Sequence, residues 1–557
     1  MPARRWLACI AICVTLSAHA DTAKPSHAAI ASAHPLATQA GLDILSQGGN
    51  AFDASVAVAA ALAVVEPNSS GVGGGGLWLL HRAADKFETM VDARETAPAA
   101  ATRDMFLDSS GNPVPGLSMN SALAAGIPGE PAGFAYLAEK YGRLPLKQSL
   151  QPAIRLAREG FPLYARLRGA IEFRRAAFSK SAEASRIFLV KGEVPALGTI
   201  IRQPDLARTL QILADRGAAG FYQGALAQRM VSGVRKLGGI WSSADLAGYQ
   251  VKEREPIVGE YRGARIVSAS PPSSGGIGLI EALNILSGYD LHAMDSATRK
   301  HLIIEAMRRV HRDRAEYLGD PDFVKVPVEL LTNPYYAAGL RASIRTDRAT
   351  PSDALPGIVE GGQPGTQTTH FSVLDAEGNR AAVTITVNFG FGSGLIIPGT
   401  GIALNNEMDD FSIKPGVPNG FQLVGADANA IAPGKRMLSS MAPTFVESKE
   451  GVMILGSPGG SFIIGMVLLG TLERLDGHDA QEIVALPRYH HQYLPDVVMY
   501  ESKALTAAEQ EALKKRGHQL RAMSRSYGNM QVVTWNYKDG AVSAASDPRG
   551  EGGGVVY

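Results

Sequence analysis

Residues 54–65 constrain the fold more than any other stretch of the chain, because they form a helix-like run that is apolar on every side. A helix of this kind is either a membrane span or completely buried in protein. At about 12 residues the run is too short to cross a bilayer, which needs about 20. We therefore expect a helix buried on all sides, with Asn50 as its N-cap and Asp53 in its first turn.

The remaining periodicity predicts a protein of mixed α and β structure. Helical spacing is found at 35–45, over most of 131–240, at 277–286 after a Pro/Ser/Gly turn, and in a charged amphipathic stretch at 298–317. Strands are predicted at 77–80, 87–91, 370–374, 380–387 and 452–455, and in a closing hairpin at 532–535 and 541–545. A tight turn at 456–460 leads into a helix at 462–472, and 349–367 lacks periodicity and is typical of an exposed loop.

The first 20 residues have the pattern of a secretory signal peptide. A basic start is followed by an apolar run, and Ala18 and Ala20 form a small-x-small cleavage signal before Asp21. We expect a periplasmic or secreted protein without a membrane anchor. Removal of this segment also removes the two cysteines, Cys9 and Cys13. The mature chain then has no disulfide, no thiolate metal site and no cysteine nucleophile.

Charge and motifs exclude several other classes of protein. Lys+Arg is 54 and Asp+Glu is 53, so the chain lacks the basic excess expected of a nucleic-acid-binding protein. The sequence has no HExxH, no GxSxG, no SxxK and no P-loop. His490 and His491 are adjacent, so their rings diverge and are better suited to packing than to chelation. We therefore expect no metal and no organic cofactor.

Thr368 stands at the junction between the 349–367 loop and a strand. A threonine hydroxyl is a weak nucleophile, but its own free α-amino group, with a pKa near 8, can accept its proton. This arrangement requires a cut between Gln367 and Thr368. From the junction alone, an ordinary strand start with β-branched residues is the commoner interpretation.

Polar residues elsewhere favour the catalytic interpretation. Acids and amides would bind an ammonium, an arginine and paired serine hydroxyls would bind a carboxylate, and glycine N–H groups at a strand-to-helix turn would hold an oxyanion. Together they would suit a zwitterionic acyl substrate. The set comprises Arg94, Thr384, Thr386, Asn388, Glu407, Asp410, Ser439, Ser440, Gly459 and Gly460.

These motifs resemble those of the γ-glutamyltranspeptidases, which are N-terminal nucleophile hydrolases. The resemblance covers nearly the whole mature chain. The resemblance is found at residues 34–35, 53–54, 94–98 and 546–549. More specific motifs are found at 368–373, 404–411, 427–430, 438–441 and 456–460.

The resemblance implies an α+β fold, a four-layer αββα sandwich built as one large unit. It also implies a proenzyme that cuts itself between Gln367 and Thr368. The products would be a large subunit of residues 21–367 and a small catalytic subunit of residues 368–557, which together form a heterodimer.

The resemblance further assigns roles to the polar set. Thr368 would attack the γ-amide of glutathione or another γ-glutamyl compound, oriented by Thr386, and would pass the acyl group to water, an amino acid or a dipeptide. The N–H groups of Gly459 and Gly460 would hold the oxyanion. Arg94, Ser439 and Ser440 would bind the α-carboxylate of the glutamyl group, and Asn388, Glu407 and Asp410 its α-amino group.

The sequence departs from the family at two positions. Residue 407 is Glu where many bacterial members have Gln, and both can accept a hydrogen bond from an ammonium. Residues 416–436 resemble the lid loop of the family, in which Phe421 stands where a Tyr is common, so a gating hydroxyl bond would be lost.

Two other functions remain open at this stage. One is a cephalosporin (glutaryl) acylase of the same fold, and the other is an uncleaved periplasmic amino-acid-binding protein.

Overall fold

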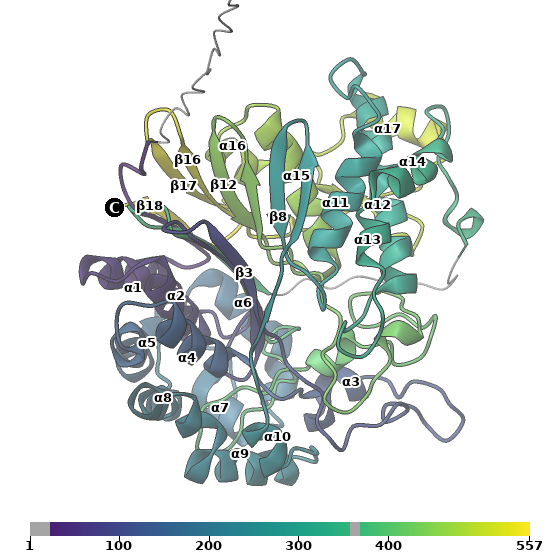
Figure 1. The fold of residues 1–557 in the computed structure, drawn as a ribbon. Coiled ribbons are helices and arrows are strands. Elements are labelled where there is room, and N and C mark those ends of the chain that lie inside the picture. Colours follow the sequence, from purple (N-terminus) through teal and green to yellow (C-terminus); the bar gives the residue numbers. More distant parts are fainter. Residues whose placement is uncertain (1–22, 357–367) are drawn as a thin grey trace, which may run out of the picture.

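Two antiparallel sheets pack face to face at the centre of the molecule (Figure 1). The structure, a computed structural model, describes residues 23–356 and 368–557. The predicted signal peptide and Gln367 lie outside this range. Small and branched side chains such as Ala31, Leu79 and Ile454 fill the space between the sheets.

The strands form one seven-stranded and one six-stranded sheet, with two minor sheets nearby. The seven-stranded order is β18 (Gly553–Val556), β1 (Ala29–Ser32), β9 (Thr369–Leu374), β10 (Arg380–Thr386), β2 (Gly75–Arg82), β3 (Phe87–Ala93) and β6 (Lys252–Arg254). The six-stranded order is β17 (Val542–Ser546), β16 (Gln531–Asn536), β12 (Gly451–Gly456), β11 (Thr444–Glu447), β8 (Ala264–Ser268) and β7 (Ile257–Tyr261). The minor sheets pair β13 (Tyr489–His490), β14 (Val498–Tyr500) and β15 (Leu520–Ala522), and β4 (Phe161–Pro162) with β5 (Ile200–Ile201).

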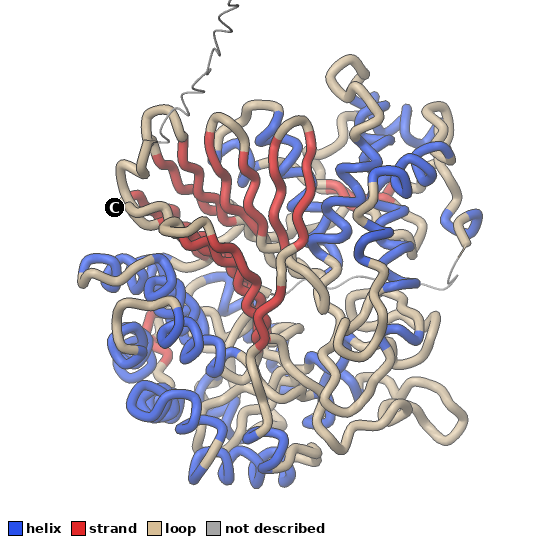
Figure 2. The backbone as a smooth tube through the Cα atoms, viewed as in Figure 1, coloured by secondary structure: helices blue, strands red, loops and turns tan. Residues whose placement is uncertain are grey.

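Helices cover the outer face of each large sheet, as Figure 2 shows. On the seven-stranded sheet pack α1 (Pro35–Ser46), α2 (Ala51–Val65) and α4 (Glu130–Lys140), with α5 (Leu146–Glu159) packed on α2. On the six-stranded sheet pack α11 (Gly275–Leu286), α15 (Ile463–Leu475) and α16 (Ala480–Ala485), with α12 (Ser296–Tyr317) packed on α11. The order helix, sheet, sheet, helix confirms the predicted αββα sandwich.

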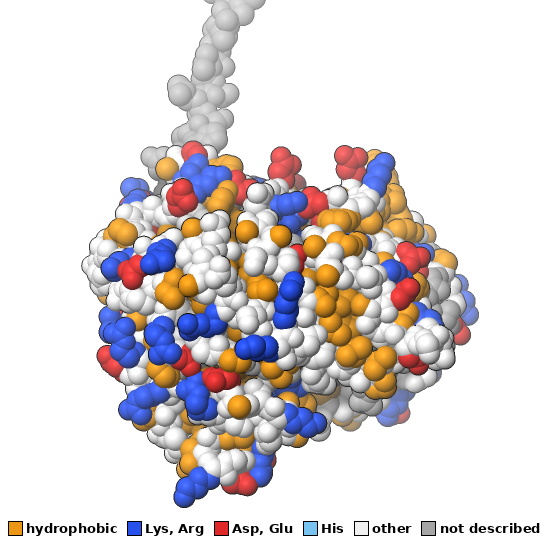
Figure 3. Space-filling model, turned by 90° about the horizontal axis from the view of Figure 1, so that it is seen from below, with side chains coloured by type: hydrophobic (Ala, Val, Ile, Leu, Met, Phe, Trp, Pro, Cys, Tyr) orange, Lys and Arg blue, Asp and Glu red, His pale blue; other side chains and the backbone are white. Residues whose placement is uncertain are grey.

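The remaining helices surround these layers. They are α3 (Leu117–Asn120), α6 (Ala165–Phe178), α7 (Ala182–Phe188), α8 (Pro204–Tyr222), α9 (Gly224–Lys236), α10 (Ser243–Ala247), α13 (Val328–Leu331), α14 (Pro334–Ala342) and α17 (Ala507–Lys515). Within the two described segments, no helix combines the length and the apolar character that a membrane crossing requires. On the face shown in Figure 3, cationic, anionic and hydrophobic side chains are interspersed.

Helix α2 matches its prediction, since all its residues are buried. Asn50 caps the helix, and its Oδ1 accepts from the N–H groups of Phe52 and Asp53 over 2.9 and 3.1 Å. The Asp53 carboxylate accepts in return from the Asn50 N–H over 3.0 Å. This reciprocal capping box satisfies the free N–H groups of a helix end that has no access to water.

The predicted strands, the closing hairpin and the helix at 298–317 are present, and residues 349–356 of the predicted loop are exposed or partly exposed except for Ser352. Most charged side chains of α12 are buried rather than solvated, and Arg309 pairs with Glu305 one turn away over 2.7 Å. Ser352, in the loop expected to be exposed, is buried and donates to the Tyr493 carbonyl over 2.6 Å. Residues 357–367 of that loop lie outside the described range. Charge pairing allows these polar side chains to be buried.

Each large sheet contains strands that precede Thr368 in the sequence and strands that follow it. In the seven-stranded sheet, β9 and β10 lie between β1 and β2. In the six-stranded sheet, β11 pairs with β8. A cut before Thr368 would therefore leave the ladders and the core between the sheets intact.

Candidate active site

Thr368 immediately precedes β9 and is 5% exposed. The pairing of Thr369 with Ile385 brings residue 368 opposite Thr386 at the end of β10. Their hydroxyl oxygens are 3.3 Å apart. The Thr386 oxygen accepts from the Asn388 N–H over 2.8 Å, so its own proton is available to Thr368. Thr386 can therefore orient the Thr368 hydroxyl, as the sequence predicts.

His370 lies behind this pair and does not serve as its base. Its Nδ1 is 2.9 Å from the Thr384 hydroxyl and its Nε2 is 3.2 Å from the Ser372 hydroxyl. Burial lowers the pKa of His370 to about 3, so the ring is neutral. These bonds fix β9 against β10, and the proton acceptor for Thr368 must be another group.

Arg94 follows β3, and its guanidinium is paired with acids. Its Nη2 donates to Asp410 over 2.5 Å, its Nη1 contacts Glu407, and Glu95 is 3.7 Å away. Burial raises the pKa of the Glu407 and Asp410 carboxyls, and the Arg94 charge opposes that effect. The predicted carboxylate-binding and ammonium-binding groups thus neutralise each other here.

The predicted amide and hydroxyl groups lie around this ion pair. Asn388 donates from Nδ2 to the Asn406 carbonyl over 2.9 Å. Ser439 Oγ accepts from the Met441 N–H over 2.9 Å. Ser440 makes no hydrogen bond to any described residue, so its hydroxyl is available to a ligand.

Gly459 and Gly460 form the turn from β12 toward α15. Their φ angles are 144° and 54°, in the range that favours glycine. A Cβ on Gly460 would lie 2.4 Å from the Phe421 ring. The turn therefore needs glycine both for its backbone conformation and for its close approach to Phe421.

A small cavity of about 20 Å³ joins these groups. It is lined by Arg94, Arg314, Thr368, Thr386, Asn388, Glu407, Asp410, Phe421, Leu423, Ser439, Ser440, Met441, Gly460 and Ile463. Of the residues singled out from the sequence, Thr384, Gly459 and Gln367 are missing from this lining, and Gln367 lies outside the described range. The volume holds about one water molecule, so a glutamyl group does not fit without movement of the lining.

Phe421 and Leu423 cover the cavity. The Phe421 ring stacks on Phe389 with centroids 4.2 Å apart and planes at 16°. Gln492 donates to the carbonyl of Gln422 over 3.2 Å. The covering segment is thus held by an aromatic stack and a backbone contact, neither of which needs a hydroxyl at position 421.

Sequence reasoning missed Arg314, the second guanidinium of the cavity. It is buried on α12, and its Nε donates to the Ser274 hydroxyl over 3.1 Å. Burial lowers its pKa to about 10, while Asp410 acts in the opposite sense. Its position in a run of six charged residues within 308–316 gave no signal that this one faces the site.

A possible metal-ligand set among the described residues lies apart from this cavity. His301, Glu305 and His518 are buried together. Most of their polar atoms already have partners, since the two rings bond over 2.7 Å and Glu305 pairs with Arg309, whereas His518 Nδ1 has none among the described residues. His490 and His491 are also buried, with His490 packed on Phe462. The packing role predicted for these two histidines is confirmed.

Comparisons with known proteins show which family the chain belongs to. The glutathione hydrolase proenzyme of Escherichia coli K12 is 44% identical over 527 residues, which cover 93% of this chain and 90% of the relative. The cephalosporin acylase from Bacillus halodurans has a TM-score of 0.84 at 29% identity, covering 100% of this chain and 98% of its own.

A γ-glutamyltranspeptidase structure from Helicobacter pylori has a TM-score of 0.57 at 43% identity, covering 58% of this chain and 93% of its own. The family model for γ-glutamyltranspeptidase matches residues 37–557. The chain belongs to the γ-glutamyltranspeptidase family.

Proposed function

We propose that this chain is the proenzyme of a γ-glutamyltransferase that also hydrolyses glutathione. The observation that carries the proposal is the position of the Thr368 hydroxyl. It lies 3.3 Å from its orienting partner Thr386, in the same cavity as the Arg94–Asp410 ion pair. A nucleophile beside a paired cation and anion suits an acyl substrate that carries both an ammonium and a carboxylate.

Maturation begins with Thr368 in the intact chain. Its Oγ attacks the Gln367 carbonyl carbon, the peptide C–N bond breaks, and the freed nitrogen takes the hydroxyl proton. Water then hydrolyses the resulting ester, which releases a Gln367 carboxylate and restores the Thr368 hydroxyl beside the amine that the first step freed. The strained Thr368 backbone, with φ of 136°, favours breakage of this bond.

The products of this cleavage are a large subunit of residues 21–367 and a small subunit of residues 368–557. Their shared sheets hold them together as a heterodimer. The relative from E. coli is called a proenzyme, and the H. pylori chain covers 58% of this one, as expected of one subunit of two. Both facts support the division.

In the mature enzyme the Thr368 α-amino group takes the proton from Oγ as Oγ attacks the γ-carbonyl carbon. The negative charge that develops on the carbonyl oxygen is stabilised by the N–H groups of Gly459 and Gly460. The C–N bond of the donor breaks, and its nitrogen leaves with the proton held by the α-amino group. Water or an acceptor amine then attacks the γ-glutamyl ester and restores Thr368.

When the glutamyl group binds, its two charges replace the contacts that Arg94 and the acids make with each other. Its ammonium is bound by Asp410, Glu407 and Asn388, and its carboxylate by Arg94 and the two serines. Each charge-assisted bond contributes roughly 1.5–3 kcal/mol. Because the Arg94 side chain is buried and that of Asp410 is only 11% exposed, a ligand must satisfy both of them when it separates them.

This requirement decides between the proposed donor and the rival acyl group of a cephalosporin acylase. A glutaryl group has a carboxylate but no ammonium. Bound at Arg94, it would take the hydrogen-bonded cationic partner from Asp410 and Glu407 and leave Arg314 as the other cation in the cavity, which is costly. We therefore propose γ-glutamyl donors, with amino acids, dipeptides or water as acceptors.

The site of action is the periplasm or the extracellular medium, after removal of residues 1–20. This part of the proposal rests on the signal-like pattern of those residues and on the cysteine-free mature chain.

A comparison of two chromogenic donors tests the proposed specificity. The purified protein should release p-nitroaniline from γ-glutamyl-p-nitroanilide at least about tenfold faster, in kcat/KM, than from glutaryl-p-nitroanilide, as expected for one charged bond. Faster release from the glutaryl compound would favour the acylase. An intact chain without activity on either donor would favour an amino-acid-binding protein.

A further inference from the structure

The helix layer on the six-stranded sheet contains a cavity that is separate from the site around Thr368. It has a volume of about 420 Å³ and shares no lining residue with the cavity that joins Thr368 to the ion pair. Its walls come from the start of α12, the end of α15 and the segment between α16 and β14, so we call it the α12–α15 cavity. Ligand sites commonly enclose about 300–1,000 Å³, and a cavity of this size therefore suits a small molecule.

Most residues that line the α12–α15 cavity are apolar. Ile303 on α12 and Leu469 and Leu472 on α15 belong to the hydrophobic core behind it. Met294 and Leu486 pack against that core and are only partly buried. The wall therefore favours contact with a hydrocarbon chain or ring.

Two of the cations that line the cavity already have partners. Arg299 pairs with Asp476 and lies 3.7 Å from Glu473, which also lines the cavity. Lys300 pairs with Glu509 over 2.6 Å. These charges are compensated within the protein and leave the lining without a strong field from either of them.

Lys503 and Tyr489 are the polar groups that remain for a ligand. Lys503 is exposed and forms no ion pair with any residue of the two described segments. Tyr489, on β13, is 5% exposed, and its hydroxyl forms no hydrogen bond within the same segments. A buried hydroxyl without a partner is unfavourable unless a ligand or water supplies one. The two groups can bind a carboxylate, the lysine through its charge and the tyrosine by donating its proton.

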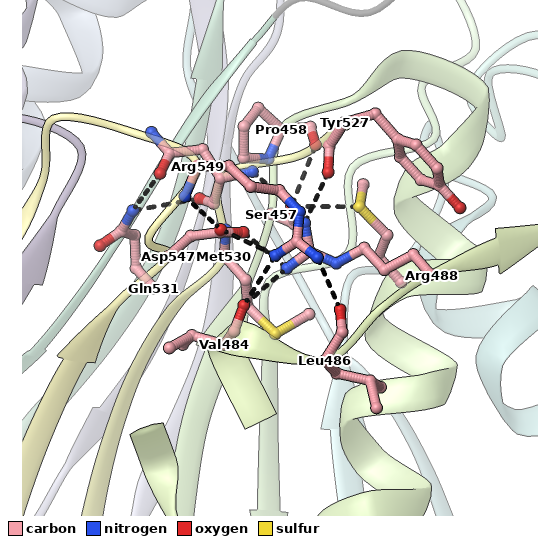
Figure 4. A network of polar contacts seen from close by, with 12 residues as sticks. Ser457, Pro458, Val484, Leu486, Arg488, Tyr527, Met530, Gln531, Asp547 and Arg549 are labelled. Atoms are coloured by element: carbon pink, nitrogen blue, oxygen red, sulfur yellow. Dashed lines mark hydrogen bonds and ion pairs between the residues drawn. The ribbon is translucent and has the colours of Figure 1, made fainter. Parts of the chain in front are cut away.

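The segment 486–489 that forms one wall is fixed by a polar network (Figure 4). Arg549 donates from Nη2 to the Leu486 carbonyl over 2.9 Å. Arg488, which precedes Tyr489, is buried and pairs with Asp547 over 2.6 Å. Because these contacts are made within the protein, the wall keeps its shape without a ligand.

We propose that the α12–α15 cavity binds a small amphipathic carboxylate, with its hydrocarbon part on the apolar wall and its head group at Lys503 and Tyr489. The ligand is an alkyl or aryl chain that ends in one negative charge. A shorter chain would lose apolar contacts, and a neutral alcohol would lose the charge. This assignment does not rest on the proposed acyl transfer, because none of its residues belongs to the Thr368 site.

Octanoate is the probe, and isothermal titration calorimetry on the purified protein measures its Kd. Octanoate should bind saturably, and hexanoate about fifteenfold more weakly, because each of the two missing methylenes is worth about fourfold in affinity. n-Octanol and octyltrimethylammonium carry the same chain with no charge and with the opposite charge. Both should bind at least about fivefold more weakly than octanoate, as expected for a partly screened charge-assisted bond.

Lys503→Gln and Tyr489→Phe should each weaken octanoate binding about three- to tenfold, because each removes one head-group contact. Lys503→Gln should leave n-octanol binding unchanged, which distinguishes a lost charge from a damaged cavity. Lys449→Gln is the matched control, since Lys449 is also exposed and unpaired among the described residues but lines a different cavity. Thr368→Ala should bind octanoate as the wild type does, whatever its catalytic activity.

Equal affinities for octanoate and n-octanol, or undiminished octanoate binding in both variants, would reveal an apolar surface without head-group recognition and overturn the proposal. The absence of saturable binding would overturn it as well. Displacement of octanoate by L-glutamate would place the ligand at the Thr368 site instead, which also contradicts the assignment.

Discussion

Arg94 donates from Nη2 to Asp410 over 2.5 Å, within the cavity that also contains the Thr368 hydroxyl. The two side chains come from positions more than 300 residues apart in the sequence. In the absence of substrate they neutralise each other, and a glutamyl zwitterion can replace each partner with its own opposite charge. This exchange explains how a buried site can hold both charges stably and still bind the substrate.

Replacing Asp410 by Asn should lower kcat/KM for γ-glutamyl-p-nitroanilide by about ten- to hundredfold, because the substrate ammonium loses a charged partner. Steady-state kinetics on the cleaved enzyme would measure this loss. Asp427→Asn is the control, since Asp427 is exposed and pairs with Arg103 outside the cavity. Equal kinetics for the Asp410 variant and wild type would contradict the assigned role.

Replacing Thr386 by Val should lower kcat by about ten- to hundredfold, because the Thr368 nucleophile loses its orienting bond. KM should change little, since Thr386 is not assigned to the glutamyl charges. Thr386→Ser keeps the hydroxyl and should retain most of the activity. If Thr386→Ser lowered kcat as much as Thr386→Val, the packing of the threonine side chain, and not its hydroxyl, would be responsible for the loss.

Replacing Phe421 by Ala should shift the products from transfer toward hydrolysis. The stack on Phe389 holds the covering segment closed, and losing a pair of this kind changes such an equilibrium by about two- to tenfold. Product analysis with a fixed acceptor concentration would measure the shift. Phe389→Ala removes the other ring of the same stack and should act in the same direction. Opposite effects of the two variants would refute a shared role.

Glu95 should make stability depend on pH. Burial raises the pKa of Glu95 to about 8, above its ordinary value of 4.5, with Arg94 acting in the opposite sense. The folded state therefore holds the proton more tightly than the unfolded state. The stabilisation from this group is complete below about pH 4.5 and is lost as the pH rises toward 8.

Glu95→Gln should remove this contribution, so that the free energy of unfolding falls less between pH 5 and pH 8 than in wild type. Denaturant unfolding of both proteins at the two pH values measures the difference. Parallel pH dependences would show that Glu95 is ionised in the folded protein.

The sequence predicts well those helices and strands whose residue pattern is compatible with only one environment, such as complete burial. Residues 54–65 must be buried on all sides, and α2 is. The alternating residues after Thr368 predict strands, and β9 and β10 follow, with every residue of both strands buried. The fold and most of the cavity lining were predictable because these signals are local or carried by family motifs.

What the sequence does not predict depends on contacts between distant residues. The charges of α12 are typical of a solvated helix, and only the structure shows Glu305 and Arg309 paired inside. Arg314 was missed for the same reason. The pairing of Arg94 with the acids also differs from the roles inferred for substrate binding, because the substrate-free site must balance its own charges.

The most direct test of the account is a denaturing gel of the purified wild type beside Thr368→Ala, with N-terminal sequencing of each band. The account predicts two bands for wild type, the smaller one beginning at Thr368, and one uncut, inactive chain for the variant. Two bands from Thr368→Ala, or a wild-type chain that remains intact and active, would contradict it.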